Sequence, residues 1–250
     1  MIVYPNAKIN IGLNILEKRA DGYHELSSVF YPVKDLCDIL EVLPSTKFYF
    51  SSSGIEIPGE ENICAKAFEM LKQDFDIDNV KIHLHKQIPI GAGLGGGSAD
   101  GAFMLKAINI LFDLKLSASQ LEKYAFQLGA DCPFFIENIP RYVQGIGENM
   151  SSVDLDFSAS KLKFIFPELH ISTAEAYGGI IPKTPATNLM DLINQPIENW
   201  KGKVKNDFEV TAFAKHPQLQ KMKEQLYADG ALYASMSGSG SVLYGVFNSF

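Results

Sequence analysis

The chain has 250 residues, of which 46% are hydrophobic and 20% are charged, and its formal net charge is −7. This composition is typical of a globular protein, and no apolar run approaches the roughly 20 residues that a membrane-spanning helix needs, which excludes an integral membrane protein. No run rich in lysine or arginine offsets the negative charge, so we expect no binding to nucleic acid and no membrane partner.

The length allows one large domain or two modest ones, and we expect two. The Ser- and Asp-rich run 151–160 is the best linker candidate, which predicts an N-terminal domain of residues 1–153 and a C-terminal domain of residues 154–250. Three cysteines are scattered without a C-x-x-C pair, so we expect core residues rather than a disulfide framework or a zinc site. No secretory signal or transit peptide is readable, which predicts a cytoplasmic protein, and we expect a monomer or a weak homodimer.

Strands dominate the first fifty residues. Residues 9–15 alternate apolar and polar side chains, which predicts a strand with one buried and one polar face. Lys8 and Asn10 are expected to point the same way from this strand. Residues 28–33 predict a second strand after a charged turn.

Between residues 38 and 86 the sequence predicts a hairpin, a helix and a further strand. Residues 38–43 and 47–50 predict a hairpin closed by a Pro-Ser-Thr turn, and residues 62–71 predict a helix. Residues 80–86 alternate again, which predicts a half-buried strand. His83 and His85 share one face of it, but no third ligand is apparent, so we interpret them as solvated strand histidines rather than a metal site.

The stretch 89–100 is the most informative in the chain, because it has five glycines in seven residues and leads into an apolar helical pattern. Glycine tolerates positive φ and lets successive backbone N–H groups approach an anion. The following helix adds its own unpaired N–H groups and the positive end of its dipole. The order strand, glycine loop, helix therefore predicts a phosphate-binding turn, and a triphosphate is the natural ligand.

Two other nucleotide-binding motifs, the dinucleotide-binding motif and the P-loop, are alternatives for this loop. It satisfies G-x-G-x-x-G, but a dinucleotide fold needs a second strand that ends in an acidic residue roughly 20 positions on, and Asp113 follows no strand-length apolar run. The P-loop motif needs a lysine where Gly97 stands. A flexible linker is disfavoured as well, because a strand and a nearly all-apolar helix flank the loop at close range.

The second half of the chain has clear helix boundaries. Ser117 and Gln120 have the spacing of a capping box, and Gly129 is expected to end that helix. Ser172 and Glu175 repeat the capping spacing. The remaining expected elements are a turn at 145–148, a strand at 161–166, a loop-rich stretch at 182–196, a helix at 217–229 and a strand at 242–247.

The loop Pro-x-Gly-Ala-Gly-Leu-Gly-Gly-Gly-Ser, residues 89–98, closely resembles the ATP loop of the small-molecule kinases grouped with galactokinase, homoserine kinase and mevalonate kinase, the GHMP kinases. Residues 8–13 and 19–26 are similar to the substrate-side signature of the 4-diphosphocytidyl-2-C-methylerythritol kinase family within that group. Later blocks match in the same order, at residues 129–134, 145–148, 172–173, 206–209 and 237–240.

The resemblance implies an α+β, two-domain GHMP-kinase-like fold. Its N-terminal domain would be a ribosomal-protein-S5-like α/β domain with a left-handed βαβ-type unit, and its C-terminal domain a ferredoxin-like α/β sandwich. The active site would lie in the cleft between the domains. ATP is the implied co-substrate, with Mg²⁺, and the other partner is a small-molecule alcohol.

The resemblance also assigns roles residue by residue. Asp131 would orient or deprotonate the acceptor hydroxyl, while Lys8 would keep that carboxylate ionised and stabilise the charge in transit. Ser98 would contact a phosphate oxygen or the magnesium ion. The implied ATP-binding residues are Asn62, Pro89, Gly91, Ala92, Gly93, Leu94, Gly95, Gly96, Gly97 and Ser98. The implied substrate-binding residues are Asn10, Tyr23, His24, Thr173 and Tyr177, with Tyr23 and His24 at the cytosine.

Each assignment has a structural alternative. Asp131 could be a helix N-cap, Lys8 a solvated lysine, Tyr177 a core aromatic and Ser98 a simple N-cap. The glycine at position 101 departs from the alanine that is usual in the family, which predicts a loosening of about 1 kcal/mol for an exposed helix interior.

The sequence therefore predicts an ATP-dependent kinase that phosphorylates the methylerythritol part of a cytidine-diphosphate substrate. Three alternatives stay open: a homoserine or mevalonate type of kinase, a nucleotide-binding sensor without turnover, and, more distantly, a dinucleotide-dependent dehydrogenase. Asp21-Gly22-Tyr23-His24 argues against the first, and the presence of both Lys8 and Asp131 argues against the second.

Overall fold

The computed structural model describes residues 1–59 and 61–249. The chain forms two compact units, each built from separate stretches of sequence. The first unit comprises Met1–Lys8, Pro32–Ile90 and Gly95–Ile139, and the second comprises Ile9–Tyr31, Gly91–Leu94 and Pro140–Phe250. The division of the chain after residue 153 stays a prediction.

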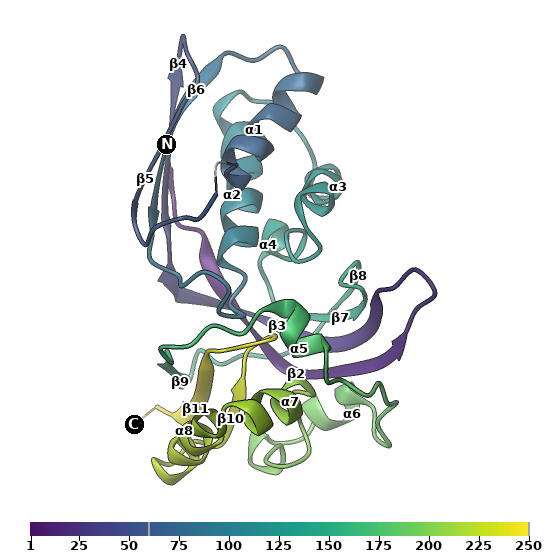
Figure 1. Cartoon of the computed structure of the whole chain (residues 1–250). Helices are drawn as coiled ribbons and strands as arrows, with labels where there is room; N and C mark the ends of the chain where they lie inside the picture. Colours follow the sequence, from purple (N-terminus) through teal and green to yellow (C-terminus); the bar gives the residue numbers. More distant parts are fainter. Residues whose placement is uncertain (60, 250) are drawn as a thin grey trace. The chain divides into compact units, whose positions relative to one another are not determined.

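The first unit contains a four-stranded sheet with helices on one side of it (Figure 1). The strand order is β1 (Ile2–Val3), β4 (Ile39–Ser45), β6 (Asn79–Lys86) and β5 (Tyr49–Gly54). The helices are α1 (Ile63–Asp74), α2 (Gly96–Leu111), α3 (Ala118–Leu128) and the short α4 (Phe134–Glu137).

The hairpin predicted from residues 38–50 is wrong. β4 runs antiparallel to β6, and β5 pairs in parallel with the opposite edge of β6, so β4 and β5 do not pair with each other. The connection through α1 makes the parallel pairing possible, because parallel strands need a long crossover. His83 and His85 face β5, where Ser51 and Ser53 hydrogen-bond their ring nitrogens.

The helix ends of the first unit follow the capping signals in the sequence. The side chain of Asn62 accepts a hydrogen bond from the amide of Cys64 at the start of α1. Ser117 and Gln120 form the predicted capping box of α3, and Gly129 ends that helix. α1 buries a stripe at helical spacing, made by Cys64, Ala67, Phe68 and Leu71.

The second unit holds two further sheets. One has the order β2 (Asn6–Lys18), β3 (His24–Cys37), β7 (Arg141–Gly145) and β8 (Asn149–Ser152), and its strands β2 and β3 also contribute residues to the first unit. The other has the order β10 (Tyr233–Met236), β11 (Leu243–Asn248) and β9 (Ser160–Ile165). Their helices are α5 (Thr173–Tyr177), α6 (Leu189–Ile193), the 3-10 turn η1 (Ile197–Asn199), α7 (Phe208–Lys215) and α8 (Pro217–Ala228).

Helix α8 packs on β10 and β11 and buries Leu219 and Leu226 among them. The predicted helix at 217–229 and the strands at 161–166 and 242–247 are confirmed, whereas α7 and β10 were not predicted. The stretch 182–196 also contains the short helix α6. The sheets and helices together confirm the α+β class of fold.

Burial corrects two expectations. The strand around residues 9–15 has no solvent-exposed polar face, because every residue from Asn6 to Leu13 is buried. The glycine at position 101 is buried against α1, where an added Cβ would lie 2.9 Å from Cγ1 of Ile63, so it is not an exposed helix position. Cys64 and Cys132 are core residues as expected, and Cys37 is half-buried.

Within the described part of the chain, no helix is both long enough and apolar enough to cross a membrane.

Candidate active site

Lys8 and Asp131 form an ion pair in the first unit. Lys8 extends from β2 with a side chain only 4% exposed, and its Nζ lies 3.5 Å from Oδ2 of Asp131, whose side chain is 36% exposed. Burial lowers the pKa of Lys8, and the neighbouring Asp131 carboxylate opposes that shift. A buried ammonium thus faces a carboxylate that solvent and ligands can reach.

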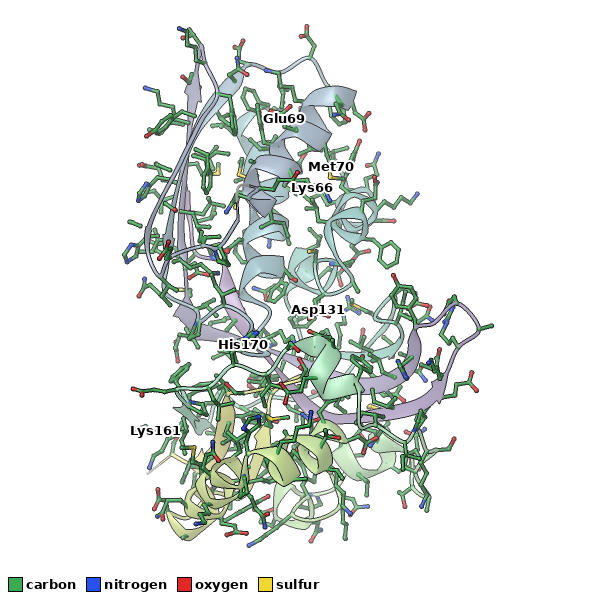
Figure 2. All side chains as sticks on the ribbon, viewed as in Figure 1. Lys66, Glu69, Met70, Asp131, Lys161 and His170 are labelled. Atoms are coloured by element: carbon green, nitrogen blue, oxygen red, sulfur yellow. The ribbon has the colours of Figure 1, made fainter. Side chains whose placement is uncertain are left out.

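The structural alternatives for these two residues are wrong. Lys8 is not a solvated lysine, as its burial shows. Asp131 lies in the connection between α3 and α4, where it is labelled in Figure 2, but the N-cap of α4 is Pro133 and no side chain caps that helix. Asp131 is therefore free of a capping role.

The second half of the glycine loop borders this ion pair. Gly95 takes φ +69° as the N-cap of α2, and within the described residues no side-chain cap bond is made there. An added Cβ on Gly95 would lie 3.0 Å from Cγ of Lys8, and one on Gly97 would meet no atom within 4 Å. The backbone N–H groups at the start of α2 thus have no side-chain cap, which is the arrangement that binds phosphate.

The first half of the loop belongs to the second unit, where it packs on the turn after β10. Gly93 has φ +78°, and an added Cβ would overlap the carbonyl oxygen of Ser237. The hydroxyl of Ser237 donates to the carbonyl of Gly93 at 2.8 Å. Asn206 holds the same turn by donating to the carbonyls of Met236 and Gly238. Gly91 lies against the ring of His170, which Figure 2 labels.

The other implied ATP-binding residues have identifiable structural roles. Asn62 caps α1, as described above. Ser98 is the third residue of α2 rather than its N-cap, and its side chain interacts with the thiol of Cys132. Burial raises the pKa of that thiol to about 12, so it is neutral. Ala92 and Leu94 are buried, and Pro89 is half-buried.

The second unit brings two of the implied substrate residues into contact. The rings of His24 and Tyr177 lie 4.8 Å apart between centroids, tilted by 31°. Tyr177 also contacts Phe208 edge to face at 4.8 Å, so it is partly a core aromatic. Tyr23 is 62% exposed beside this group. An exposed tyrosine and a histidine stacked on a second tyrosine suit a flat heterocycle.

Two further implied substrate residues lie in the same unit. Thr173 is exposed and is the first residue of α5, directly after the capping Ser172. Asn10 is buried and donates to the hydroxyl of Ser28 at 2.9 Å. That hydroxyl donates in turn to the carbonyl of Gly12.

Sequence reasoning missed several residues that hold the loop. The hydrogen bonds from Asn206 and the contact of His170 could not be found from spacing. A buried group of charges formed by Asp38, Lys86 and Asp100 was also missed. A signal for Lys86 existed, because it continues the buried phase of Val80, Ile82 and Leu84 along β6.

Comparison with known proteins gives first the class and then the family. A model described as GHMP kinases N terminal domain matches residues 62–138, and one described as GHMP kinases C terminal matches residues 185–250. A crystal structure of homoserine kinase from Cytophaga hutchinsonii has the same fold, with a TM-score of 0.71 at 18% identity over 98% of this chain and 85% of that one. The fold and the loop thus define a GHMP kinase.

Closer matches narrow the class. The chain is 47% identical over 250 residues to the 4-diphosphocytidyl-2-C-methyl-D-erythritol kinase of Azobacteroides pseudotrichonymphae, covering 99% of this chain and 93% of that relative. A crystal structure of 4-(cytidine 5'-diphospho)-2C-methyl-D-erythritol kinase matches with a TM-score of 0.81 and 31% identity, over 98% of this chain and 90% of that one. The chain belongs to the 4-diphosphocytidyl-2-C-methyl-D-erythritol kinase family.

Proposed function

We propose that this protein transfers the terminal phosphate of ATP to the 2-hydroxyl of 4-diphosphocytidyl-2-C-methyl-D-erythritol, giving the 2-phosphate and ADP. This reaction belongs to the non-mevalonate route to isoprenoid precursors. The observation that carries the proposal is the Lys8–Asp131 ion pair beside the uncapped N-terminus of α2, in a chain of this family.

The phosphate loop and the N-terminus of α2 hold the triphosphate through backbone N–H groups. Residues 91–98 approach the phosphates closely because glycine adds no side chain. Phosphoryl transfer has a loose transition state, so catalysis depends mainly on positioning and on charge stabilisation. Lys8 supplies a fixed positive charge that water does not screen, because its side chain is buried.

Asp131 orients the acceptor hydroxyl and receives its proton. Its carboxylate is 36% exposed and lies 3.5 Å from the ammonium of Lys8, so an acceptor hydroxyl can reach it. The proton leaves the hydroxyl as the new O–P bond forms and the bond to ADP breaks. Since the loose transition state demands little of a base, Asp131 acts as much by orientation as by basicity.

Aromatic side chains of the second unit recognise the cytosine. Tyr23 stacks on the face of the base, His24 hydrogen-bonds its edge, and Tyr177 contacts the ring of His24. Thr173 and Asn10 complete the set of substrate residues. These assignments rest on the family and on the contact between His24 and Tyr177.

Magnesium would be held at this site together with the nucleotide phosphates. Mg²⁺ prefers oxygen ligands and is usually bound through one or two protein oxygens together with substrate phosphates. The hydroxyl of Ser98, at the third residue of α2, is a hard oxygen donor that fits this requirement. A bound ion would neutralise charge on the phosphates, while the residues of this chain position them.

The test is coupled ADP release by the purified protein with three alcohols in parallel: the cytidylylated methylerythritol, homoserine and mevalonate. We expect turnover with the first alone. Turnover with homoserine or mevalonate instead would assign the chain to a different GHMP activity. ATP binding without turnover on any of the three would identify a nucleotide sensor.

A further inference from the structure

Three charged side chains are buried together behind the phosphate loop. Asp38 follows β3, Lys86 ends β6, and Asp100 lies in the second turn of α2. Their exposed fractions are 0%, 3% and 2%, respectively. Lys86 Nζ donates to Oδ2 of Asp100 at 2.7 Å and to Oδ2 of Asp38. We refer to these three residues as the buried charge cluster.

Asp38 fixes the backbone where β6 turns into the loop. Its Oδ1 accepts from the amides of Gln87 at 2.5 Å and Ile88 at 2.8 Å. These are the first two residues after the strand, so the carboxylate sets the direction in which the chain leaves the sheet. The other oxygen of the same carboxylate binds Lys86.

Lys86 fixes the chain where the loop ends and α2 begins. Besides its bond to Asp100, its Nζ lies 3.0 Å from the place that a Cβ on Gly96 would occupy, and Gly96 is the first residue of α2. One ammonium therefore contacts the start of α2 and, through Asp38, the residues that open the loop. Residues 89–95 connect these two anchored points in the sequence.

Stability alone does not account for this cluster. Replacing a buried ion pair or triad by well-packed apolar residues is often neutral or stabilising, because the desolvation of the charges offsets their attraction. Here two carboxylates share one ammonium, and Oδ1 of Asp100 has no hydrogen-bond partner within residues 1–59 and 61–249. Burial, with Asp38 nearby, raises the pKa of Asp100 to about 7, although Lys86 opposes the shift.

We propose that Asp38, Lys86 and Asp100 are positioning residues that hold the phosphate loop and the first turn of α2 in the geometry that binds the triphosphate of ATP. All three side chains are buried, and they bind one another and the backbone. Their effect is on where the backbone N–H groups point, and it is specific to the nucleotide. This inference rests on the proposed function, since it names the residues that shape the ATP site.

The principal test is the triple variant Asp38→Asn/Lys86→Met/Asp100→Leu. It removes all three charges, keeps an oxygen at position 38 for the amides of Gln87 and Ile88, and fills the volume with apolar groups. We expect a folded protein whose KM for ATP rises about tenfold, while the KM for the alcohol changes by less than about twofold. Backbone amides of residues 95–98 should exchange with deuterium faster. A folded triple variant with the KM for ATP and the exchange rates of the parent protein would overturn the proposal.

A second pair of variants keeps the proposal testable if the triple variant does not fold. Asp100→Asn leaves an oxygen for Lys86, whereas Asp100→Ala removes the contact with α2. We expect the KM for ATP to rise much more in Asp100→Ala than in Asp100→Asn. Equal values in the two variants would contradict a positioning role for this contact.

Lys72→Met is the matched control. Lys72 also joins a helix to β6, but it bonds Asn79 at the opposite end of that strand. Its loss should leave the KM for ATP unchanged, and a rise comparable to that of the triple variant would count against the proposal.

The assay also separates this inference from the proposed function. Calorimetric titration with ATP measures nucleotide binding without turnover, so it decides the role of the cluster even if the parent protein phosphorylates none of the alcohols tested. Absence of turnover in the parent protein refutes the proposed function alone. Equal ATP affinity in the parent protein and the triple variant refutes the inference alone.

Discussion

Two aspartates of the first unit show how surroundings decide what a carboxylate can do. Asp131 is 36% exposed and faces one buried ammonium, so a ligand can reach its carboxylate. Asp100 is buried, shares its ammonium with a second carboxylate, and has a pKa of about 7. The first arrangement suits chemistry on a bound alcohol, and the second suits the fixing of backbone.

At Asp131, replacement by asparagine keeps the size and one oxygen but removes the charge and the ability to take a proton. We expect Asp131→Asn to lower kcat by about 100-fold or more, since general base catalysis alone contributes about 10²–10⁴-fold. The KM for ATP should change little. Steady-state kinetics at saturating alcohol measure both quantities, and near-normal turnover would refute the role of Asp131.

The burial of Lys8 predicts a pH dependence of stability. Its pKa in the folded protein is below 10.5, so in the interval between that lowered value and 10.5 the unfolded chain binds more protons than the folded one. The free energy of unfolding therefore rises with pH through that interval. We expect Lys8→Met to flatten this rise in urea unfolding measured at several pH values.

Lys115→Met is the control for this measurement, because it removes a lysine whose side chain is 78% exposed. A Lys8→Met variant with the same pH slope as the parent protein would show that burial does not penalise the ammonium at position 8.

At the scale of elements, sequence patterns predicted the features that depend on residues close together in the chain. The glycine loop, α2 and the capping box of α3 follow from residues that are near in sequence. The arrangement of β4 and β5 on either side of β6 does not follow from nearby residues. Strands that are neighbours in sequence often pair, and nothing in residues 38–54 reveals that both pair with β6 instead.

The same reasoning applies to the site. Lys8 and Asp131 are far apart in sequence, and a family resemblance was needed to connect them before the structure showed the contact. The buried charge cluster escaped prediction because a lone charge in an apolar pattern gives no clue to its partner. Lys86 and Asp100 lie on different elements, and each becomes informative only when the other is seen beside it.

The close contact of α1 with α2 gives a prediction on packing. An alanine at position 101 gains about 1 kcal/mol in helix propensity, but overpacking a well-filled site costs about 1–3 kcal/mol. Its Cβ would lie 2.9 Å from Cγ1 of Ile63 and 3.3 Å from Cδ1 of Leu128. We therefore expect Gly101→Ala to lower the free energy of unfolding.

A double-mutant cycle with Ile63→Ala isolates this overlap. If the clash causes the loss, the double variant will be more stable than the sum of the two single changes predicts, measured by urea unfolding. Strict additivity would contradict the packing explanation.

At the scale of the whole molecule, the net negative charge opposes the binding of an anionic ligand. The chain has a net charge of −7 and its proposed ligand is strongly anionic, so we expect binding to depend on local positive groups: the N-terminus of α2 and the buried Lys8. A cation bound to the phosphates would reduce the remaining repulsion.

We accordingly expect a non-hydrolysable ATP analogue to stabilise the protein strongly only with Mg²⁺. A ligand at about 100 times its Kd adds about 2.7 kcal/mol to the stability of the state that binds it. For a chain of this size that corresponds to a rise in Tm of about 5–10 °C. The rise should shrink to a few degrees at most when EDTA removes the metal, and it should persist in Asp131→Asn, which keeps the phosphate loop. Thermal unfolding scans of both proteins measure these shifts, and an equal rise with and without Mg²⁺ would show that the loop and Lys8 neutralise the phosphates unaided.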